Sequence, residues 1–458
     1  MTVMARPWRR LTPTGRIAVP LLVLLVLLGL LGFLGLVTGI IPGLVDFVLR
    51  LAGANPGIVR FIVAAVAVLL LSIPIAFING YAELKVIALM QSRIGPNRVG
   101  PFGTLQAVFH GFKMLAKEDF TPLGADRPAF TLAPVVVFLT VVLSFLVIPF
   151  APGLYGADLN VGLLYFFAVG GLSVVGLLMA GWSSFNKYSL LGGLRSAAQI
   201  VSYEIPLTLS VVGLVMLAGT MSLNGIVEAQ GGQFWHWYVF QQPLGFAIFF
   251  IAVSAEANRT PFDLTEADSE IVAGYMTEYS GMRFGFFYFA EYVSLFIISA
   301  LTAVLFLGGW HAPVDTHALA SFFGLTVPAL SIDPGSLGVG LLLLITLGPL
   351  IGTLLLTVPV ALWRTDWSIW RALLVGFLLF NVAVGALITI YAYVASEVVA
   401  GVFWVMAKTF TLVFVFIWIR TTLPRVRVDQ LMAFAWKWLL PAALLNIFVT
   451  AAAIVVLS

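Results

Sequence analysis

Acidic side chains gather in one short polar segment of an otherwise apolar sequence. Residues 256–278 contain six of the 20 Asp and Glu residues, namely Glu256, Asp263, Glu266, Asp268, Glu270 and Glu278. If this segment is helical, residues 263, 266 and 270 share one face, because side chains three and four positions apart are neighbours. Carboxylates this close cannot all be ionised in a poorly solvated site, so they titrate as a coupled set. The segment could therefore store or relay protons; the alternative is a solvated acidic loop, or one paired with Arg259 and Arg283.

Further ionisable residues lie inside or at the ends of apolar runs, where a charge is costly and is by default a functional candidate. They are Glu83, Glu204, Glu256, Glu291 and Lys408. Glu204 precedes Pro206 by two residues, at a point where proline frees backbone groups. Lys408 precedes Arg420 by about 18 Å of helix, which predicts a position near the middle of a bilayer.

The composition limits the class of protein that these residues can serve. Of the 458 residues, 61% are hydrophobic and 9% are charged, whereas soluble domains carry about 25% charged residues. This balance excludes a soluble enzyme, a disordered chain and a nucleic-acid binder. The sequence has no cysteine and four histidines, and it contains no HExxH motif and no glycine-rich nucleotide fingerprint. We therefore expect this chain to bind no metal and no redox cofactor of its own.

Apolar runs predict the elements that must position these side chains. A membrane span needs about 20 mostly apolar residues. Eleven runs qualify, at 17–41, 59–82, 131–150, 161–182, 203–220, 238–256, 285–308, 338–362, 372–395, 398–419 and 437–457. The prediction is an all-α fold, a polytopic transmembrane helix bundle of about 11 spans forming one integral membrane domain over 1–458. Residues 43–52 are predicted to form a short helix in the outer interface or, alternatively, an ordinary loop.

The basic residues predict the orientation of the bundle. With the N-terminus in the cytoplasm, twenty of the 23 Lys and Arg residues fall on the inner side, as the positive-inside rule requires. The long polar loops are then cytoplasmic, so we expect function at that face. The first span could instead be a signal peptide; its length and the lack of a small-residue cleavage site favour a retained helix.

Four strings of polar sequence are too long and too specific to be simple connections. They cover Glu83–Pro128, with a Gly-Pro-Asn turn between cations, and also Gly181–Pro206, Ala255–Gly281 and Trp418–Pro441. Together they closely resemble the membrane subunit of respiratory complex I that adjoins its peripheral arm. This is the family of the bacterial H subunit and of mitochondrially encoded subunit 1.

The resemblance covers about 59–310 and 398–457 and implies a family core of about eight spans there. Residues 1–58 add one N-terminal helix and the interfacial segment, and 311–397 form an inserted segment with two spans, at 338–395. An inserted pair leaves every later span in its original orientation. A single leading helix moves only the N-terminus to the cytoplasm, so the family topology agrees with the charge count.

The resemblance also implies roles for individual residues. In the family, carboxylates line a hydrophilic path that leads from a quinone chamber into the membrane arm. The matching proton path here contains Glu83, Glu204, Glu256, Asp263, Glu266, Asp268, Glu270, Glu278 and Glu291, to which membrane depth adds Lys408. The expected contributors to the quinone chamber are Glu83, Lys85, Arg93, Lys117 and Glu118.

The implied activity is that of one subunit of a proton-translocating NADH-quinone oxidoreductase. Quinone is then the substrate, and FMN, iron–sulfur clusters and NADH are expected on partner subunits. The expected partners are peripheral-arm subunits at the cytoplasmic face, small membrane subunits, quinone and the lipid bilayer, with no nucleic acid. The expected location is the bacterial inner membrane, which the chain crosses several times.

The sequence departs from the family pattern at several positions. Leu84 stands where the family has arginine, and His110 where an acidic residue is usual. The other departures are Phe185, Thr265, Asp268 and Met276, which replace Asn, Pro, Glu and His. The acidic pattern is kept, whereas Leu84 removes a cation from the expected quinone entrance.

Three other functions remain open from the sequence. One is the homologous anchor subunit of a relative that takes electrons from ferredoxin, a deazaflavin donor or a hydrogenase; the long first and third polar segments favour the quinone-reducing version. A stand-alone secondary transporter is disfavoured because no internal repeat is visible. A purely structural anchor predicts that the buried carboxylates tolerate neutralisation.

Overall fold

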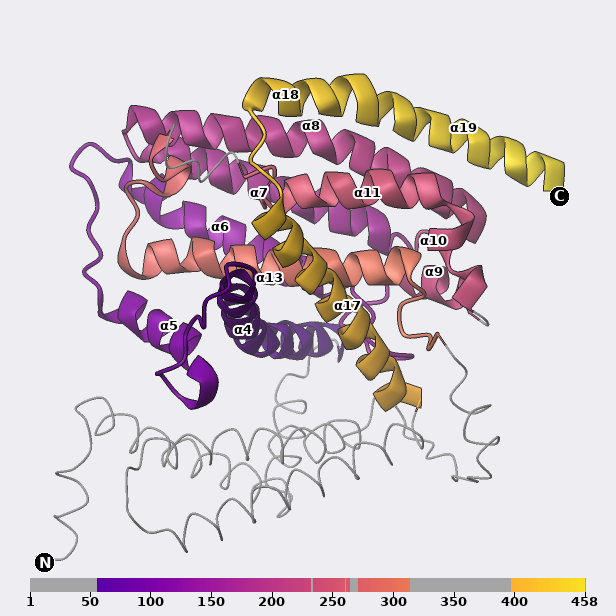
Figure 1. Ribbon diagram of the computed structural model, residues 1–458, viewed down its shortest axis with the longest axis horizontal. Helices are drawn as coiled ribbons and strands as arrows, with labels where there is room; N and C mark the ends of the chain where they lie inside the picture. The colour runs from indigo at the N-terminus through magenta and orange to yellow at the C-terminus, as the bar shows by residue number, and fades with distance from the viewer. Residues whose placement is uncertain (1–55, 232–233, 260, 264–270, 314–396, 458) are drawn as a thin grey trace, which may run out of the picture. The chain divides into compact units, whose positions relative to one another are not determined.

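The computed structural model describes residues 56–231, 234–259, 261–263, 271–313 and 397–457 (Figure 1). The predicted span 17–41, the interfacial segment 43–52 and the predicted pair at 338–395 lie outside the described residues. The chain divides into two compact units by its contacts. One unit, here called the main unit, comprises 65–95, 106–335 and 393–458; the other comprises 1–64, 96–105 and 336–392. The site described below lies within the main unit, and a single domain over 1–458 stays a prediction.

The described residues form helices joined by turns and short loops. The long helices are α4 (Pro56–Met90), α6 (Arg127–Phe145), α7 (Gly162–Ser183), α8 (Lys187–Ala218), α11 (Pro243–Glu256), α13 (Gly281–Phe306), α17 (Glu397–Thr422) and α19 (Leu440–Leu457). Shorter helices are α5 (Gln106–Ala116), α9 (Leu223–Ala229), α10 (Tyr238–Gln241) and α18 (Val428–Phe434), which a π-helical turn at Ala435–Leu439 joins to α19. Three 3-10 turns lie at Pro101–Gly103, Phe234–His236 and Gly274–Met276.

Seven helices in the described part of the chain are long and apolar enough to cross a membrane, and α11 is a shorter apolar helix. An all-α membrane bundle is therefore confirmed for these residues. The total of about 11 spans stays a prediction, because three of the predicted runs lie outside the described residues.

The predicted spans differ from the helices mainly at their starts. Helix α7 agrees with its predicted run within one residue at each end, whereas α8 begins at Lys187 rather than at 203. The start of α8 was missed because it is polar and rich in small residues. Asn186 caps it by accepting a hydrogen bond from the Tyr188 backbone N–H at 2.9 Å. Glu204 consequently lies inside α8 rather than at its beginning.

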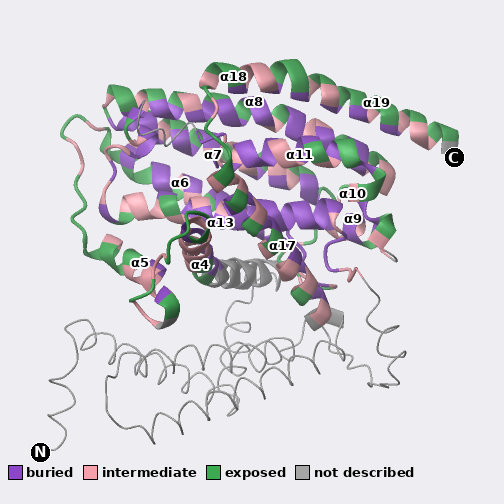
Figure 2. Ribbon diagram, in the orientation of Figure 1, coloured by how far each residue is buried: buried purple, intermediate pink, exposed green. Residues whose placement is uncertain are grey.

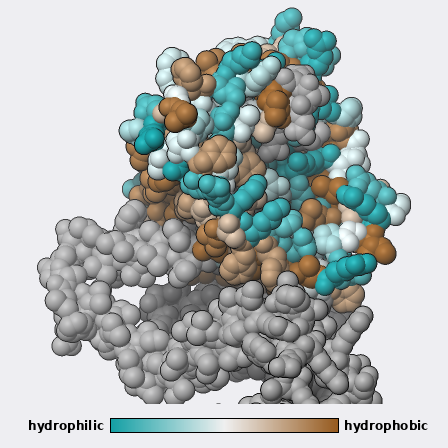
Figure 3. Space-filling model, turned by 90° about the vertical axis from the view of Figure 1, so that its left-hand side faces the viewer, coloured by the Kyte–Doolittle hydropathy of each residue, from teal (hydrophilic) through white to brown (hydrophobic). Residues whose placement is uncertain are grey.

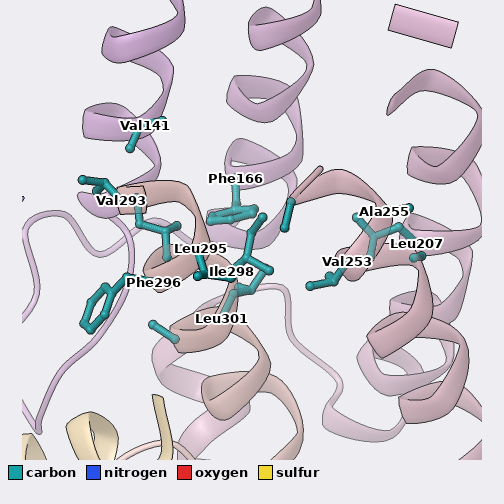
Figure 4. Packing of buried hydrophobic residues seen from close by; sticks show 14 of the residues in the cluster. Val141, Phe166, Leu207, Val253, Ala255, Val293, Leu295, Phe296, Ile298 and Leu301 are labelled. Atoms are coloured by element: carbon teal, nitrogen blue, oxygen red, sulfur yellow. The ribbon is translucent and has the colours of Figure 1, made fainter. Parts of the chain in front are cut away.

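Helix α13 is the central element of the main unit. From Ala290 to the end of the helix at Phe306 the residues are buried, except for Glu291 and Ser294, which are partly exposed (Figure 2). It packs against α6, α17, α5 and α11. Figure 4 shows Val293, Leu295, Ile298 and Leu301 of α13 among Val141 of α6, Phe166 of α7 and Val253 of α11. A side chain on α13 is therefore held by several neighbouring helices.

Close backbone contact joins α8 to the turn that precedes α13. A Cβ atom added to Gly192 of α8 would lie 2.6 Å from Gly274 Cα and 2.7 Å from the Tyr275 backbone nitrogen. No real Cβ approaches backbone atoms this closely, so only glycine lets α8 meet this turn. Small residues serve the same purpose where membrane helices pack tightly.

We predict that Gly192→Ala destabilises the assembled protein by about 1–3 kcal/mol, because overpacking here must displace backbone. The measurement is the midpoint of thermal unfolding of the detergent-purified complex. Gly162→Ala is the matched control, since its Cβ would lie 3.7 Å from the nearest atoms of Leu223. Equal midpoints for the two variants would contradict the prediction.

Candidate functional site

Three charged side chains from separate segments meet in the interior of the main unit. Arg259, in the loop after α11, places Nη1 3.0 Å from Oε2 of Glu83 on α4 and Nη2 3.1 Å from Oε1 of Glu291 on α13. The exposed fractions of these side chains are 4% for Arg259, 6% for Glu83 and 15% for Glu291. One buried guanidinium thus bridges two carboxylates of different helices.

Two further arginines extend this group. Arg420 of α17 pairs with the other oxygen of Glu83, Oε1. Arg425, which follows α17, places Nη2 3.2 Å from Oδ2 of Asp263, and the charge of Asp263 acts on Glu291. We call Glu83, Asp263, Glu291, Arg259, Arg420 and Arg425 the charge cluster. Its three carboxylates and three guanidinium groups balance in charge.

The loop that carries Arg259 is held by a side chain of α8. The Gln199 amide nitrogen donates to the carbonyl oxygens of Ala255 at 2.7 Å and Phe262 at 2.8 Å. Asn258 adopts a left-handed backbone with φ of 50°, a conformation that asparagine tolerates better than most residues. These features turn the chain sharply after α11 and bring Arg259 back to the bundle, where its guanidinium lies 5.1 Å from the Tyr292 ring centroid.

Glu204 and Glu256 form a second group of carboxylates beside α7. A Cβ added to Gly171 would lie 3.5 Å from Glu204 Oε1, and one added to Gly170 would lie 3.6 Å from Glu256 Oε1. Both side chains therefore face adjacent glycines of one helix, and their charges repel each other. The structure thus brings together two acids that are 52 residues apart in the sequence.

Two further described residues of the predicted proton path, Glu278 and Lys408, have hydrogen-bond partners outside these two groups. Glu278 accepts a hydrogen bond from the Asn186 side chain at 2.6 Å. Lys408 donates to the backbone carbonyls of residues 307, 309 and 311, beyond the end of α13. Glu266, Asp268 and Glu270 lie outside the described residues, so a shared helical face with Asp263 stays a prediction.

Of the five residues predicted to form a quinone chamber, Glu83 is buried in the charge cluster and the other four lie outside it. Lys85 Nζ is 3.5 Å from the Ile94 carbonyl oxygen, and Arg93, Lys117 and Glu118 are exposed. Figure 3 views the left-hand side of Figure 1, where α6, α8 and α13 begin, and hydrophilic side chains gather on this face. The face is the one predicted to be cytoplasmic.

The first and third polar segments are joined at this face. The Ser280 hydroxyl donates to the Glu118 carbonyl at 2.8 Å, and Arg283 pairs with Asp119 at 3.1 Å. Tyr279 stacks on Phe130 with ring centroids 4.0 Å apart and donates its hydroxyl to the Phe130 carbonyl at 3.1 Å. Burial raises the pKa of Tyr279 to about 12, so the hydroxyl remains a donor. The loop with Lys117 and Glu118 is therefore anchored to α6 and α13.

Sequence reasoning identified the acids of the charge cluster but missed its cations. The sequence assigns Arg420 and Arg425 only to the predicted cytoplasmic side of the bundle. It suggests Arg259 only as a partner for the carboxylates of the acidic segment. In the structure Arg259 bonds to Glu83 and Glu291, and Arg283 bonds to Asp119. The available signal was the position of these arginines at the ends of long apolar runs, where a charge needs a partner.

A cluster of this kind can transmit a change in charge. Glu83 and Glu291 share Arg259, so neutralising one of them leaves the guanidinium to the other. A buried charge without a partner is costly, so the remaining members must respond. In the described part of the chain, no group of three or more His, Asp or Glu side chains is arranged to hold a metal ion.

Comparison with known proteins agrees with the resemblance in the sequence. A model of the NADH dehydrogenase family matches residues 62–451. The H subunit of the NADH-quinone oxidoreductase of Brevibacillus brevis is 43% identical over 387 residues, which cover 84% of this chain and 91% of that protein. The corresponding H subunit of Bacillus mycoides is 44% identical over 388 residues, covering 84% and 92%. The chain therefore belongs to the NADH dehydrogenase family, among the H subunits of NADH-quinone oxidoreductase, which are multi-pass membrane subunits of respiratory complex I.

Proposed function

We propose that this subunit forms part of the quinone chamber at the junction with the peripheral arm and couples quinone reduction to proton translocation through its carboxylates. The observation that carries the proposal is the bridge that Arg259 makes between Glu83 and Glu291. The names of the relatives add support, because those proteins belong to an NADH-quinone oxidoreductase.

The proposed quinone chamber is argued from Glu83 and the cations near it in the sequence. Lys85 follows Glu83 on α4, and Arg93 lies just beyond the end of that helix. A quinone headgroup presents two carbonyl oxygens, which accept hydrogen bonds from lysine and arginine. Reduction places negative charge on the same oxygens, and fixed cations stabilise that charge. Lys117 and Glu118 lie on a second loop that is anchored at the same face.

Electrons reach quinone from partner subunits, and each quinone takes up two electrons and two protons to become quinol. Charge that appears in the chamber acts first on Glu83, the cluster carboxylate nearest to Lys85 in the chain. A change in the protonation of Glu83 alters its hold on Arg259 and Arg420. Arg259 then shifts its attraction toward Glu291, so the change in charge is carried from α4 to α13. No redox centre in this chain is required for that step.

The acids beside α7 offer the continuation of the path. Glu204 and Glu256 are half-buried and repel each other, so the pair binds or releases a proton readily when the potential around it changes. A change in the charge of the cluster is one source of such a shift. We therefore place the Glu204–Glu256 pair after the charge cluster on the proposed path.

We predict that Arg259→Met lowers quinone reduction by about 10-fold or more, because Glu83 and Glu291 lose the cation that links them. NADH:quinone activity and proton translocation of the complex in proteoliposomes are the measurements. Arg127→Met, at an exposed arginine, is the matched control.

Arg259→Lys tests the same bridge if the Met variant does not assemble. A lysine keeps the charge but lacks the planar fork that contacts two carboxylates. We expect partial quinone reduction with fewer protons moved per electron. Unchanged coupling in Arg259→Lys would contradict the role of the bridge.

We predict that Glu204→Gln impairs quinone reduction and proton translocation together, by about 10-fold or more, because the amide cannot carry a proton along the path. Both rates are measured in the same proteoliposomes. Glu228→Gln, at an exposed carboxylate of α9, should leave both unchanged. Full activity of Glu204→Gln would remove this residue from the path.

We predict that Arg93→Gln raises the KM for quinone about 3- to 10-fold with a smaller effect on kcat, as expected when binding alone is weakened. Arg98→Gln is the control, since it removes the same charge from the same loop. A KM that is unchanged in Arg93→Gln, or raised equally in both variants, would exclude Arg93 from the chamber.

A further inference from the structure

The ammonium group of Lys408 lies beside the turn that follows α13, at the end of that helix opposite to its start at Gly281. Lys408 is buried in α17, and 9% of its surface is exposed. The ammonium nitrogen donates to the carbonyl oxygens of Leu307 at 2.6 Å, Gly309 at 2.9 Å and His311 at 2.7 Å. A lysine ammonium has three N–H donors, so each donor has one carbonyl acceptor.

These carbonyls belong to the turn that ends α13. Residues 307, 309 and 311 follow Phe306, the last residue of α13, so their carbonyls lie outside the helix and need donors from elsewhere. Gly308 and Gly309 have φ values of 71° and 46°, a left-handed backbone that suits glycine. The turn directs alternate carbonyls toward one point, and the Lys408 cation satisfies them there.

The groups around the Lys408 ammonium do not repel a cation. Lys408 Nζ lies 4.1 Å from the centroid of the Trp237 ring, within the range of a cation–π interaction. Burial lowers the pKa of His311, and the Lys408 charge lowers it further, against the opposing effects of the Val227 carbonyl and Glu228. The neighbouring imidazole is therefore neutral and does not repel the ammonium. Within the described residues, Lys408 forms no ion pair with a carboxylate.

We propose that Lys408 is a positioning residue that fastens α17 to the end of α13 and so holds Arg420 and Glu291 in register within the charge cluster. Lys408 lies about 18 Å along α17 from Arg420, and Leu307 lies about 24 Å along the chain from Glu291. Helices transmit such a restraint because they are stiff along their axes. The two helices are thus joined at two levels. At one level the Lys408 ammonium binds the carbonyls after α13, and at the other the Arg420–Glu83–Arg259–Glu291 chain of pairs links the helices.

This assignment differs from the expectation that Lys408 carries protons. All three of its donors are engaged by backbone carbonyls, which cannot take up a proton near neutral pH. The step from helix register to turnover rests on the proposed function of the charge cluster, whereas the fastening of α17 to α13 does not.

The test compares Lys408→Met, Lys408→Gln and the control Lys437→Met, which makes the same change at an exposed lysine. The purified complex is measured for thermal midpoint, for kcat of quinone reduction from pH 6 to 9, and for protons moved per electron in proteoliposomes. A positioning role predicts that Lys408→Met lowers the thermal midpoint by about 3–10 °C. It also lowers kcat about 10-fold at every pH, while protons per electron and the shape of the pH profile are kept.

Lys408→Gln is one atom shorter but still offers amide donors to the carbonyls, so a positioning role predicts partial rescue of both midpoint and kcat. A proton carrier instead loses translocation to the same extent in the Met and Gln variants, with a changed pH profile, and that result would overturn the proposal. So would a Lys408→Met complex that is as stable and as active as Lys437→Met. If Arg259→Met leaves activity intact, the proposed function fails, yet the midpoints of the Lys408 variants still decide whether the fastening exists.

Discussion

The buried guanidinium of Arg259 is the constraint on which the rest of the main unit depends. A desolvated arginine without partners is costly by several kcal/mol, so the fold must bring carboxylates to it from both sides. Glu83 arrives on α4 and Glu291 on α13. The loop after α11 must therefore return toward the bundle, which accounts for the left-handed Asn258 and for the two hydrogen bonds by which Gln199 holds that loop.

The same constraint explains why α13 is so deeply buried. It carries Glu291 in its first half, where Arg259 supplies the oppositely charged partner, and only hydrophobic or small residues follow toward Phe306. Packing on all sides keeps water from the pairs, and a lower local dielectric strengthens their interaction. The ion pair of Glu291 in the first half of α13 thus depends on the apolar packing along the rest of the helix.

Hydropathy and residue type predict the helices and the buried carboxylates better than they predict contacts between residues that are far apart in the sequence. Hydropathy predicts the uniformly apolar α7 within one residue, whereas it does not detect the first 16 residues of α8, because Ser, Gly, Arg and Gln interrupt them. A carboxylate in an apolar run is a visible candidate, which is why Glu83 and Glu291 could be named. Arg259 and Arg420 lie 176 and 337 residues from Glu83, and no local pattern relates residues at such distances.

Lys408 illustrates why membrane depth alone cannot assign a role to a charged residue. A cation within an apolar run needs partners, and a proton path is one way to supply them. The turn after a buried helix is another, because its buried carbonyls need donors as much as the cation needs acceptors. Lys408 of α17 finds its acceptors at Leu307, Gly309 and His311, in the turn that follows α13. A buried charge that completes its hydrogen bonds with backbone stabilises a helix end, and one that shares a partner with another titratable group, as Glu83 shares Arg259 with Glu291, can respond to chemistry.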